Sequence, residues 1–283
     1  MNRRGVLGAL AGGLAAACSP LSAFNTLTPK DAARIGPLGV AFGDHPRQRL
    51  DIYAPPRPTG AAPPVFVWFY GGAWNSGRRS DYRWVGQALA AQGFLAVLPD
   101  HRIVPEVRYP GFVEDAALAV AAAGRLAAEH GGDPERIVVG GHSSGAYNAA
   151  MLAFDRRWLA AAGAPPVRAF AGLSGPYDFH PFDVPASIEA FGGAAEPRLT
   201  QPVNLDLGAA PPAFIAHGDR DTVVGLHNAR NLARALQAAG RDVALKIYEG
   251  LDHRDMALAL SRPFRGKAPV LADMTAFLRA RLG

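Results

Sequence analysis

The sequence has very little cysteine and no long apolar or basic run. Cys18 is the only cysteine among 283 residues, so no internal disulfide can form. No run of apolar residues is long enough to cross a bilayer, and no basic run interleaved with aromatic residues indicates nucleic-acid binding. A P-loop lysine, a dinucleotide-binding fingerprint and a cluster of metal ligands are also absent from the sequence. We therefore expect no metal, no cofactor and no nucleic-acid partner.

The composition is that of a globular protein. Hydrophobic residues make up 49% of the chain and charged residues 19%, which excludes a disordered chain and a multi-span membrane protein. The net charge of +5 comes from arginines spread along the whole chain, so it does not mark a binding patch. A chain of this length can form one large domain with a substantial core.

The first residues predict export from the cytoplasm. Arg3 and Arg4 form a positive segment, and residues 5–17 form an apolar segment of signal-peptide length. The arginine pair resembles a twin-arginine signal, and residues 15–19 resemble a bacterial lipobox, in which Cys18 carries a lipid. Alternatively, Cys18 is an incidental residue of an ordinary cleaved signal. We expect a periplasmic protein or a membrane-anchored lipoprotein of a bacterium, with the export signal and a short tail in residues 1–21.

The pattern of apolar residues predicts strands that alternate with helices. A hairpin is expected from residues 37–42 and 48–53. Further strands are expected at residues 65–69, 94–98, 137–139, 169–173, 213–216 and 243–248, and helices at 81–92, 112–129, 146–154, 226–239 and 268–282. This order predicts an α/β fold with a mostly parallel sheet, an antiparallel N-terminal hairpin and helices on both faces. Residues 22–283 would form a single domain.

Residues 175–208 interrupt this alternation. They lie between two predicted strands and are rich in Pro, Gly and Phe, including Phe179 and Phe182. Open α/β sheets place their sites at the carboxyl ends of the strands, so we expect this short insertion to lie over that edge. It shows no pattern of an amphipathic helix and is short for a lid.

Residues 137–148, IVVGGHSSGAYN, contain the clearest chemical signal. A Gly-X-Ser-X-Gly sequence centred on Ser143 lies where a predicted strand changes into a predicted helix. Neighbours with almost no side chain allow the sharp turn that exposes a nucleophilic serine. The N-terminal amides of the next helix point at a developing oxyanion. The alternative interpretation is a glycine-rich turn that serves only tight packing.

A nucleophilic serine needs a histidine and a carboxylate, and in this sheet order they follow it along the chain. His253 follows the last predicted strand, and Asp219 and Asp221 follow the strand before it. Either carboxylate could orient His253 while the other binds a backbone turn, and Asp221 is our preferred acid. Three other histidines compete with His253, but none of them follows the acid at a strand end: His101, His142 and His217.

Residues 69–74, FYGGAW, end the predicted strand that begins at residue 65. This architecture places backbone N–H donors there, opposite the N–H of Ser144. Small residues let a substrate carbonyl approach the main chain. The alternative is a plain Gly-Gly turn.

Together with residues 217–224, HGDRDTVV, and 100–106, DHRIVPE, these motifs resemble the α/β-hydrolase superfamily. Within it, residues 48–282 are similar to carboxylesterases of the hormone-sensitive-lipase-like and feruloyl/acetyl-xylan-esterase-like branches. The resemblance implies a catalytic triad and an oxyanion hole. The triad would be Ser143, Asp221 and His253, and the hole would be the N–H groups of Gly72, Ala73 and Ser144.

The sequence departs from these branches at two positions. Tyr70 stands where they usually have a histidine, and His101 stands where they usually have a tyrosine. The histidine of the branches supports its loop and does not react, so Tyr70 bears on subfamily and substrate and leaves the chemistry unchanged. The long N-terminal cap of the hormone-sensitive-lipase relatives is also missing from this sequence.

The resemblance implies a serine carboxylesterase that acts on a small-molecule ester. With a short insertion and no cap, the site would be an open cleft rimmed by Trp74, Phe179 and Phe182, which favours a short-chain or small aromatic acyl group. Two alternatives remain. One is an arylformamidase of the same superfamily, which the chain resembles at residues 175–178, GPYD. The other is a ligand-binding relative without catalytic activity.

Overall fold

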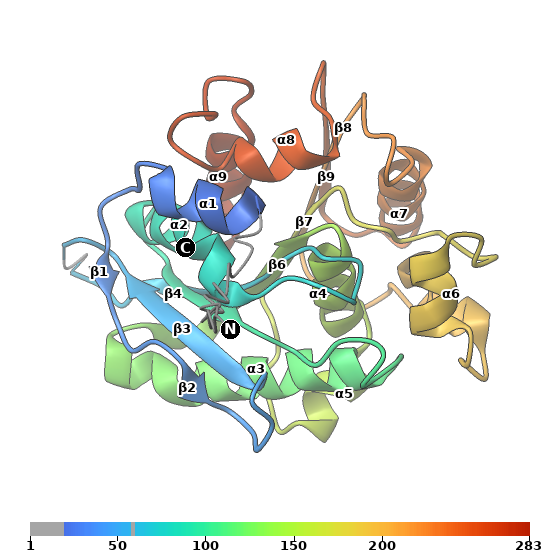
Figure 1. Ribbon diagram of the computed structural model, residues 1–283, viewed down its shortest axis with the longest axis horizontal. Helices are drawn as coiled ribbons and strands as arrows, with labels where there is room; N and C mark the ends of the chain where they lie inside the picture. The colour runs from blue at the N-terminus through green and yellow to red at the C-terminus, as the bar shows by residue number, and fades with distance from the viewer. Residues whose placement is uncertain (1–19, 58–59) are drawn as a thin grey trace, which may run out of the picture.

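The computed structural model describes residues 20–57 and 60–283, and Figure 1 shows them as one central sheet with helices around it. The strands of this described part form a nine-stranded sheet in the order β1-β3-β5-β4-β6-β7-β8-β9, with β2 beside β3. The strands are β1 (Arg34–Ile35), β2 (Val40–Ala41), β3 (Arg49–Ala54), β4 (Pro64–Phe69), β5 (Leu95–Pro99), β6 (Asp133–His142), β7 (Ala169–Leu173), β8 (Ala213–Gly218) and β9 (Val243–Tyr248).

The direction of the strands divides the sheet into two parts. From β5 through β4, β6, β7 and β8 to β9, each strand runs parallel to its neighbours. β1 and β2 run antiparallel to β3, and β3 runs antiparallel to β5. The predicted parallel sheet with an antiparallel N-terminal hairpin is therefore confirmed. Because parallel strands end at one edge, the loops after β4, β6, β8 and β9 meet there.

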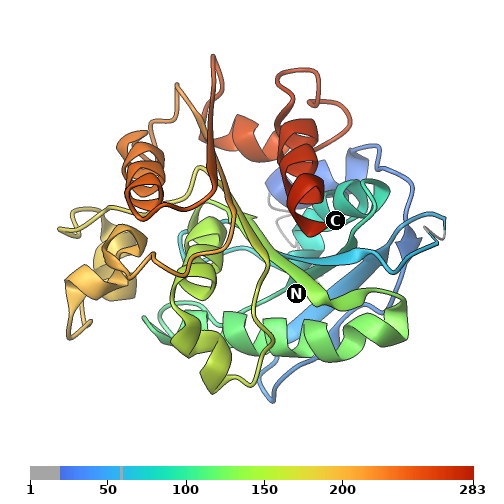
Figure 2. The same cartoon turned by 180° about the vertical axis from the view of Figure 1, so that it is seen from behind.

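Helices cover both faces of the sheet, as the front and back views show (Figures 1 and 2). The α-helices are α1 (Pro20–Leu27), α2 (Arg83–Ala91), α3 (Gly111–Ala127), α4 (Ser144–Phe154), α5 (Arg156–Ala161), α6 (Pro185–Phe191), α7 (His227–Ala238), α8 (His253–Leu258) and α9 (Val270–Leu282). Short 3₁₀ helices are η1 (Arg79–Tyr82), η2 (Ala128–His130), η3 (Pro197–Thr200) and η4 (Pro202–Asn204). The core clusters place α3, α4 and α7 on one face and α2 and α9 on the other. None of the helices in the described ranges has the length and apolarity needed to cross a membrane.

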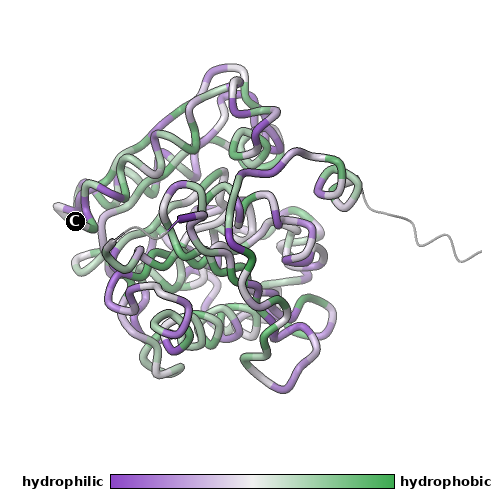
Figure 3. Tube along the Cα trace, turned by 90° about the vertical axis from the view of Figure 1, so that its left-hand side faces the viewer, coloured by the Kyte–Doolittle hydropathy of each residue, from purple (hydrophilic) through white to green (hydrophobic). Residues whose placement is uncertain are grey.

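Alternate residues of β4 face the two helical layers. Val65, Val67 and Phe69 belong to the core cluster that contains α3 and α4. Phe66 and Trp68 belong to the cluster that contains α2 and α9, and all five side chains are fully buried. A strand buried on both faces requires such a continuous apolar run. The hydropathy colouring agrees with this burial. The segments of the trace inside the domain are mostly green (hydrophobic), and the outer turns carry much of the purple (hydrophilic) (Figure 3).

The helix α1 attaches the N-terminal end of the described chain to the domain. The ring of Phe24 lies edge-on against Trp84, with 5.5 Å between the ring centroids. The hydroxyl of Ser22 donates to Asp81 Oδ1 at 2.6 Å. The helix begins two residues before residue 22, where we expected the domain to start. The expected export signal and Cys18 lie in residues 1–19, outside the described residues.

The insertion at residues 175–208 contains a helix that we did not expect. Pro185 occupies the first turn of α6, where its missing N–H is not needed. Phe191 is buried, whereas Val184 and Ile188 are 53% and 52% exposed, so α6 is a short amphipathic helix. Its seven residues are too few for helical periodicity to be recognised in the sequence.

Candidate active site

Ser143 lies in the turn between β6 and α4, near the middle of the sheet. Its backbone has φ 55° and ψ −129°, an unfavourable conformation for a residue with a side chain. The Ser143 N–H donates to Leu173 O at 2.9 Å, which ties the turn to β7. A Cβ on Gly145 would lie 2.2 Å from Phe69 O, so glycine is required there. The turn has the geometry of a nucleophile elbow.

The structure brings Ser143, His253 and Asp221 together in one chain of hydrogen bonds. His253 Nε2 lies 2.9 Å from Ser143 Oγ, and His253 Nδ1 lies 2.8 Å from Asp221 Oδ2. Asp219, the competing carboxylate, instead accepts a 2.7 Å hydrogen bond from Gly250 N. Asp221 therefore orients the histidine, and Asp219 binds a backbone turn.

Several donors hold the Asp221 carboxylate, whose side chain is fully buried. The N–H groups of Val223 and Val224 each donate to Oδ1 at 2.9 Å, and His217 Nε2 lies 3.3 Å from Oδ2. Burial by itself raises the pKa of Asp221, but the hydrogen bonds from His253 and Val224 outweigh it and lower the pKa to about 2. Asp221 thus stays ionised and holds the His253 proton on Nδ1.

A second histidine supports the first. His142 is the residue before the nucleophile, and its Nε2–H donates to the backbone carbonyl of His253 at 2.8 Å. The ring centroids of His142 and His253 are 4.7 Å apart. Burial, together with the neighbouring His253, lowers the pKa of His142 to about 3, so His142 is a neutral support for the catalytic ring. The sequence indicates His142 only as a competing base, because its contact with residue 253 is not visible there.

The loop after β4, residues 70–77, is called the oxyanion loop below. Ala73 and Trp74 have φ of 50° and 58°, a strain of about 1–3 kcal/mol for each residue. The N–H of Gly72 donates to Ser144 Oγ at 3.0 Å, so this predicted oxyanion donor already bonds a side chain. The N–H groups of Ala73 and Ser144 have no acceptor within residues 20–57 and 60–283. These two donors are available to a substrate oxygen.

The two departures from the resembled branches lie against each other. The ring of Tyr70 stacks on that of His101, with centroids 5.2 Å apart and planes 23° apart. Tyr82 stacks on Tyr70 at 5.5 Å, and its hydroxyl donates to Gly71 O at 3.2 Å. Burial and the neighbouring Arg47 lower the pKa of His101 to about 4. A stack of neutral rings therefore supports the start of the oxyanion loop.

The residues expected to line the substrate cleft belong to one aromatic cluster. Trp74 stacks on Phe179 at 6.0 Å and meets Phe191 edge-on at 4.8 Å, and Phe182 lies 5.7 Å from Phe179. The indole N–H of Trp74 donates to Asn148 Oδ1 at 3.2 Å. Trp74 is only 5% exposed, so it packs inside the cluster and does not form the exposed rim that we expected. Phenylalanines of the insertion bury it together with Phe112 and Tyr147.

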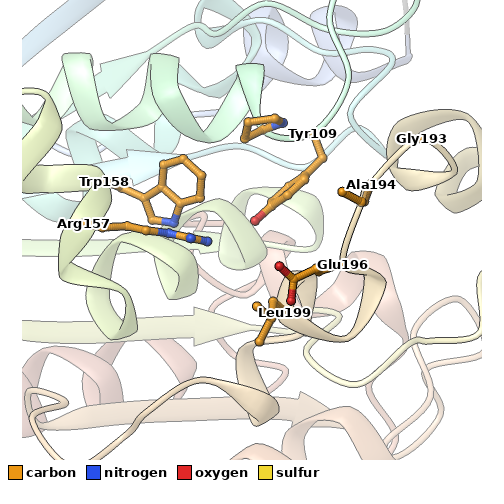
Figure 4. A pocket seen from close by; sticks show the side chains of 9 residues that line it. Tyr109, Arg157, Trp158, Gly193, Ala194, Glu196 and Leu199 are labelled. Carbon is orange, nitrogen blue, oxygen red and sulfur yellow. The ribbon is translucent and has the colours of Figure 1, made fainter.

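A hollow of about 300 Å³ lies on the outer side of this cluster. Figure 4 shows the rings of Tyr109 and Trp158 on one side of it and Glu196 and Leu199 across from them. Tyr109 lies 5.6 Å from the ring of Phe191. No triad residue lines this hollow. Within the described ranges, no group of three or more His, Cys, Asp or Glu side chains could hold a metal ion.

Comparisons with known proteins agree with this geometry. A family model described as BD-FAE matches residues 50–236. The chain is 31% identical over 257 residues to the isoprenylcysteine alpha-carbonyl methylesterase ICME of Arabidopsis thaliana, a match that covers 83% of this chain and 60% of that protein. It is 32% identical over 230 residues to the carboxylesterase NlhH of Mycobacterium tuberculosis, covering 72% of this chain and 70% of that one. The chain thus spans about three fifths of the length of the plant relative.

A solved structure, described as a truncated form of carbohydrate esterase from gut microbiota, has the same fold. Its TM-score with this chain is 0.77 at 22% sequence identity, and the match covers 90% of this chain and 98% of the other. At this identity the likeness concerns the fold alone. The sheet order described above is that of the α/β-hydrolase fold.

The two aspartates allow a direct test of the triad. Asp221→Asn should slow the reaction of Ser143 with a fluorophosphonate by about 10⁴-fold, because an amide in place of the carboxylate favours the wrong tautomer of His253. Asp219→Asn should change this rate by no more than a few-fold, because Asp219 bonds only a turn. The measurement is the second-order rate constant of labelling. A crippled Asp219→Asn beside a normal Asp221→Asn would reverse the assignment.

Proposed function

This chain belongs to the BD-FAE family of α/β-hydrolases, and on that premise we propose that it hydrolyses carboxylic esters through a serine acyl-enzyme. One observation carries the proposal: Ser143, His253 and Asp221 are joined by hydrogen bonds of 2.9 and 2.8 Å. The N–H groups of Ala73 and Ser144, which have no acceptor among the described residues, support it further. The two relatives described above are named as esterases, which is consistent with this chemistry.

In the first half of the reaction, Ser143 Oγ bonds to the ester carbonyl carbon while its proton passes to His253 Nε2. The electron pair of the carbonyl moves to its oxygen, and the N–H groups of Ala73 and Ser144 bind that oxyanion. The C–O bond to the alcohol then breaks. His253 gives its proton to the departing alkoxide, which leaves an acyl group on Ser143.

In the second half, water replaces the alcohol. His253 removes a proton from the water, whose oxygen attacks the acyl carbon, and the proton then returns to Ser143 Oγ as the acid leaves. Asp221 remains ionised throughout and stabilises the imidazolium of His253. His142 keeps the catalytic ring in place through the carbonyl of His253.

The proposed function is tested with Ser143→Ala. This change removes the nucleophile and should lower kcat on p-nitrophenyl acetate by at least ~10³-fold, while melting stays close to that of the wild type. Hydrolysis of N-formylkynurenine is measured beside that of p-nitrophenyl acetate, because residues 175–178 resemble an arylformamidase.

Three results would contradict the ester proposal. Hydrolysis by Ser143→Ala at a near wild-type rate would remove the nucleophile from the mechanism. A much higher kcat/KM on the formamide would favour the arylformamidase. Failure of wild-type protein to turn over any substrate would favour a binding protein.

We propose further that the preferred acyl groups are short, about two to six carbons, or compact and aromatic. Each methylene of an acyl chain gains ~0.8 kcal/mol only where an apolar wall receives it. Beside the oxyanion loop, the space is taken up by the packed rings of Trp74, Phe179 and Phe191. The helix α6, with seven residues, is too small to cover a long chain.

The acyl preference is measured as kcat/KM along p-nitrophenyl esters from acetate to palmitate. We expect a maximum between two and six carbons and no jump in rate at the critical micelle concentration. A maximum at ten carbons or more would mean that the aromatic cluster opens into an acyl tunnel.

Finally, we propose that the protein is exported and anchored by a lipid on Cys18, from the charged and apolar segments of residues 1–17. The full chain expressed in a bacterium should incorporate radiolabelled palmitate, and Cys18→Ser should abolish the label. A mature N-terminus at a residue other than 18 would contradict lipidation. Intact Met1 in the cytosol would contradict export as well.

A further inference from the structure

Arg47 contacts both ends of the oxyanion loop. Its Nη2 donates to Tyr70 Oη at 2.9 Å and to Gly77 O at 2.7 Å, the first and last residues of the loop. Its Nε donates to His101 O at 2.8 Å, in the segment after β5. The Arg47 guanidinium thus joins the turn between β2 and β3 to both ends of the oxyanion loop. It also joins this turn to His101, whose ring stacks on Tyr70.

The acceptors of the Arg47 guanidinium within the described residues are all neutral. Within the described residues Arg47 forms no ion pair with a carboxylate, and its partners are two backbone carbonyls and a phenol. Burial and the Asp100 carboxylate raise the pKa of Tyr70 well above its usual value, so its hydroxyl stays neutral beside Arg47. A planar guanidinium has N–H donors in fixed directions and can bond these three acceptors at once, whereas a lysine ammonium group cannot.

The two ends of the oxyanion loop must be held together. A Cβ on Gly77 would lie 2.7 Å from the ring of Tyr70, so the two ends are in close contact, and Gly77 has φ 92°. Between them, Ala73 and Trp74 hold left-handed conformations. Strained residues keep such conformations only when the surrounding structure determines them. We expect that separating the two ends would change the direction of the Ala73 N–H.

We propose that Arg47 is a positioning residue that holds the oxyanion loop closed, so that the Ala73 N–H faces the reacting carbonyl. This inference rests on the proposed function of Ser143. Arg47 lies three positions before residue 50, where the match to the family model begins. It acts through Tyr70 and Gly77 and does not touch the substrate.

The test uses Arg47→Met, which keeps the apolar stem and removes every donor, with Arg47→Lys and the matched control Arg49→Met. The Arg49 guanidinium bonds Gly39 O at 3.4 Å, away from the loop. Arg47→Met should lower kcat on p-nitrophenyl acetate about 10- to 100-fold and leave KM within about threefold, since a displaced oxyanion donor acts on the transition state. The kcat of Arg47→Lys should lie between those of the wild type and Arg47→Met. The kcat of Arg49→Met should stay within about twofold of the wild type.

A cycle with Tyr70→Phe separates positioning from general stability. The phenol is one of three acceptors of Arg47, so Tyr70→Phe should lower kcat less than Arg47→Met, and it should have no further effect in the Arg47→Met background. Melting temperatures are measured for each variant. If Arg47→Met does not fold, Arg47→Lys and Tyr70→Phe decide the question through the same kcat.

Three outcomes would overturn the proposal: kcat within twofold of wild type in the folded Arg47 variants, an equal loss in Arg49→Met, or independent effects of Arg47 and Tyr70. The rate of Ser143 labelling by a fluorophosphonate is measured in parallel. If wild-type protein labels but hydrolyses no ester, the proposed function fails while the labelling rates still test Arg47. If wild-type protein neither labels nor hydrolyses, both fail.

Discussion

The end of β4 comes so close to the end of β6 and the start of α4 that two positions accept only glycine. A Cβ on Gly141 or Gly145 would lie 2.5 or 2.2 Å from the carbonyl oxygen of Phe69. This approach brings the end of β4 beside the start of α4, where the Ser144 N–H has no acceptor within the part of the chain that the structure describes. The nucleophile and the oxyanion loop therefore share one boundary, and neither can move without the other. The remaining parts of the site are arranged around this contact.

The backbone of the oxyanion loop is strained, and three groups of contacts hold it in place. The hydroxyl of Ser144 bonds the Gly72 N–H from the nucleophile turn. The aromatic rings of the insertion surround Trp74, and the guanidinium of Arg47 joins the loop's two ends. A left-handed residue with a side chain costs about 1–3 kcal/mol, so it persists only under several independent constraints. Segments far apart in the chain together supply the energy that keeps the donors in place.

The exchange of tyrosine and histidine between positions 70 and 101 has a structural explanation. Tyr70 and His101 each differ from the residue that the resembled branches usually have. Because the histidine of the branches supports its loop, Tyr70 leaves open what supports the loop in this chain. In the structure the two rings stack at 5.2 Å, so the two departures are in direct contact. The Tyr70 hydroxyl reaches Arg47, and buried His101 remains neutral. The two departures are one local change in packing.

By itself, the sequence determined the fold class, the strand order along the chain and the nucleophile turn. These depend on local patterns: apolar runs for buried strands, and glycines on both sides of Ser143 where a strand meets a helix. Only the tertiary structure decided between Asp219 and Asp221, which lie two residues apart at one strand end and differ in which partner each side chain meets. The same holds for the burial of Trp74 and for the contacts of Arg47. They arise where distant segments meet, and no periodicity within a segment records which side chains meet there.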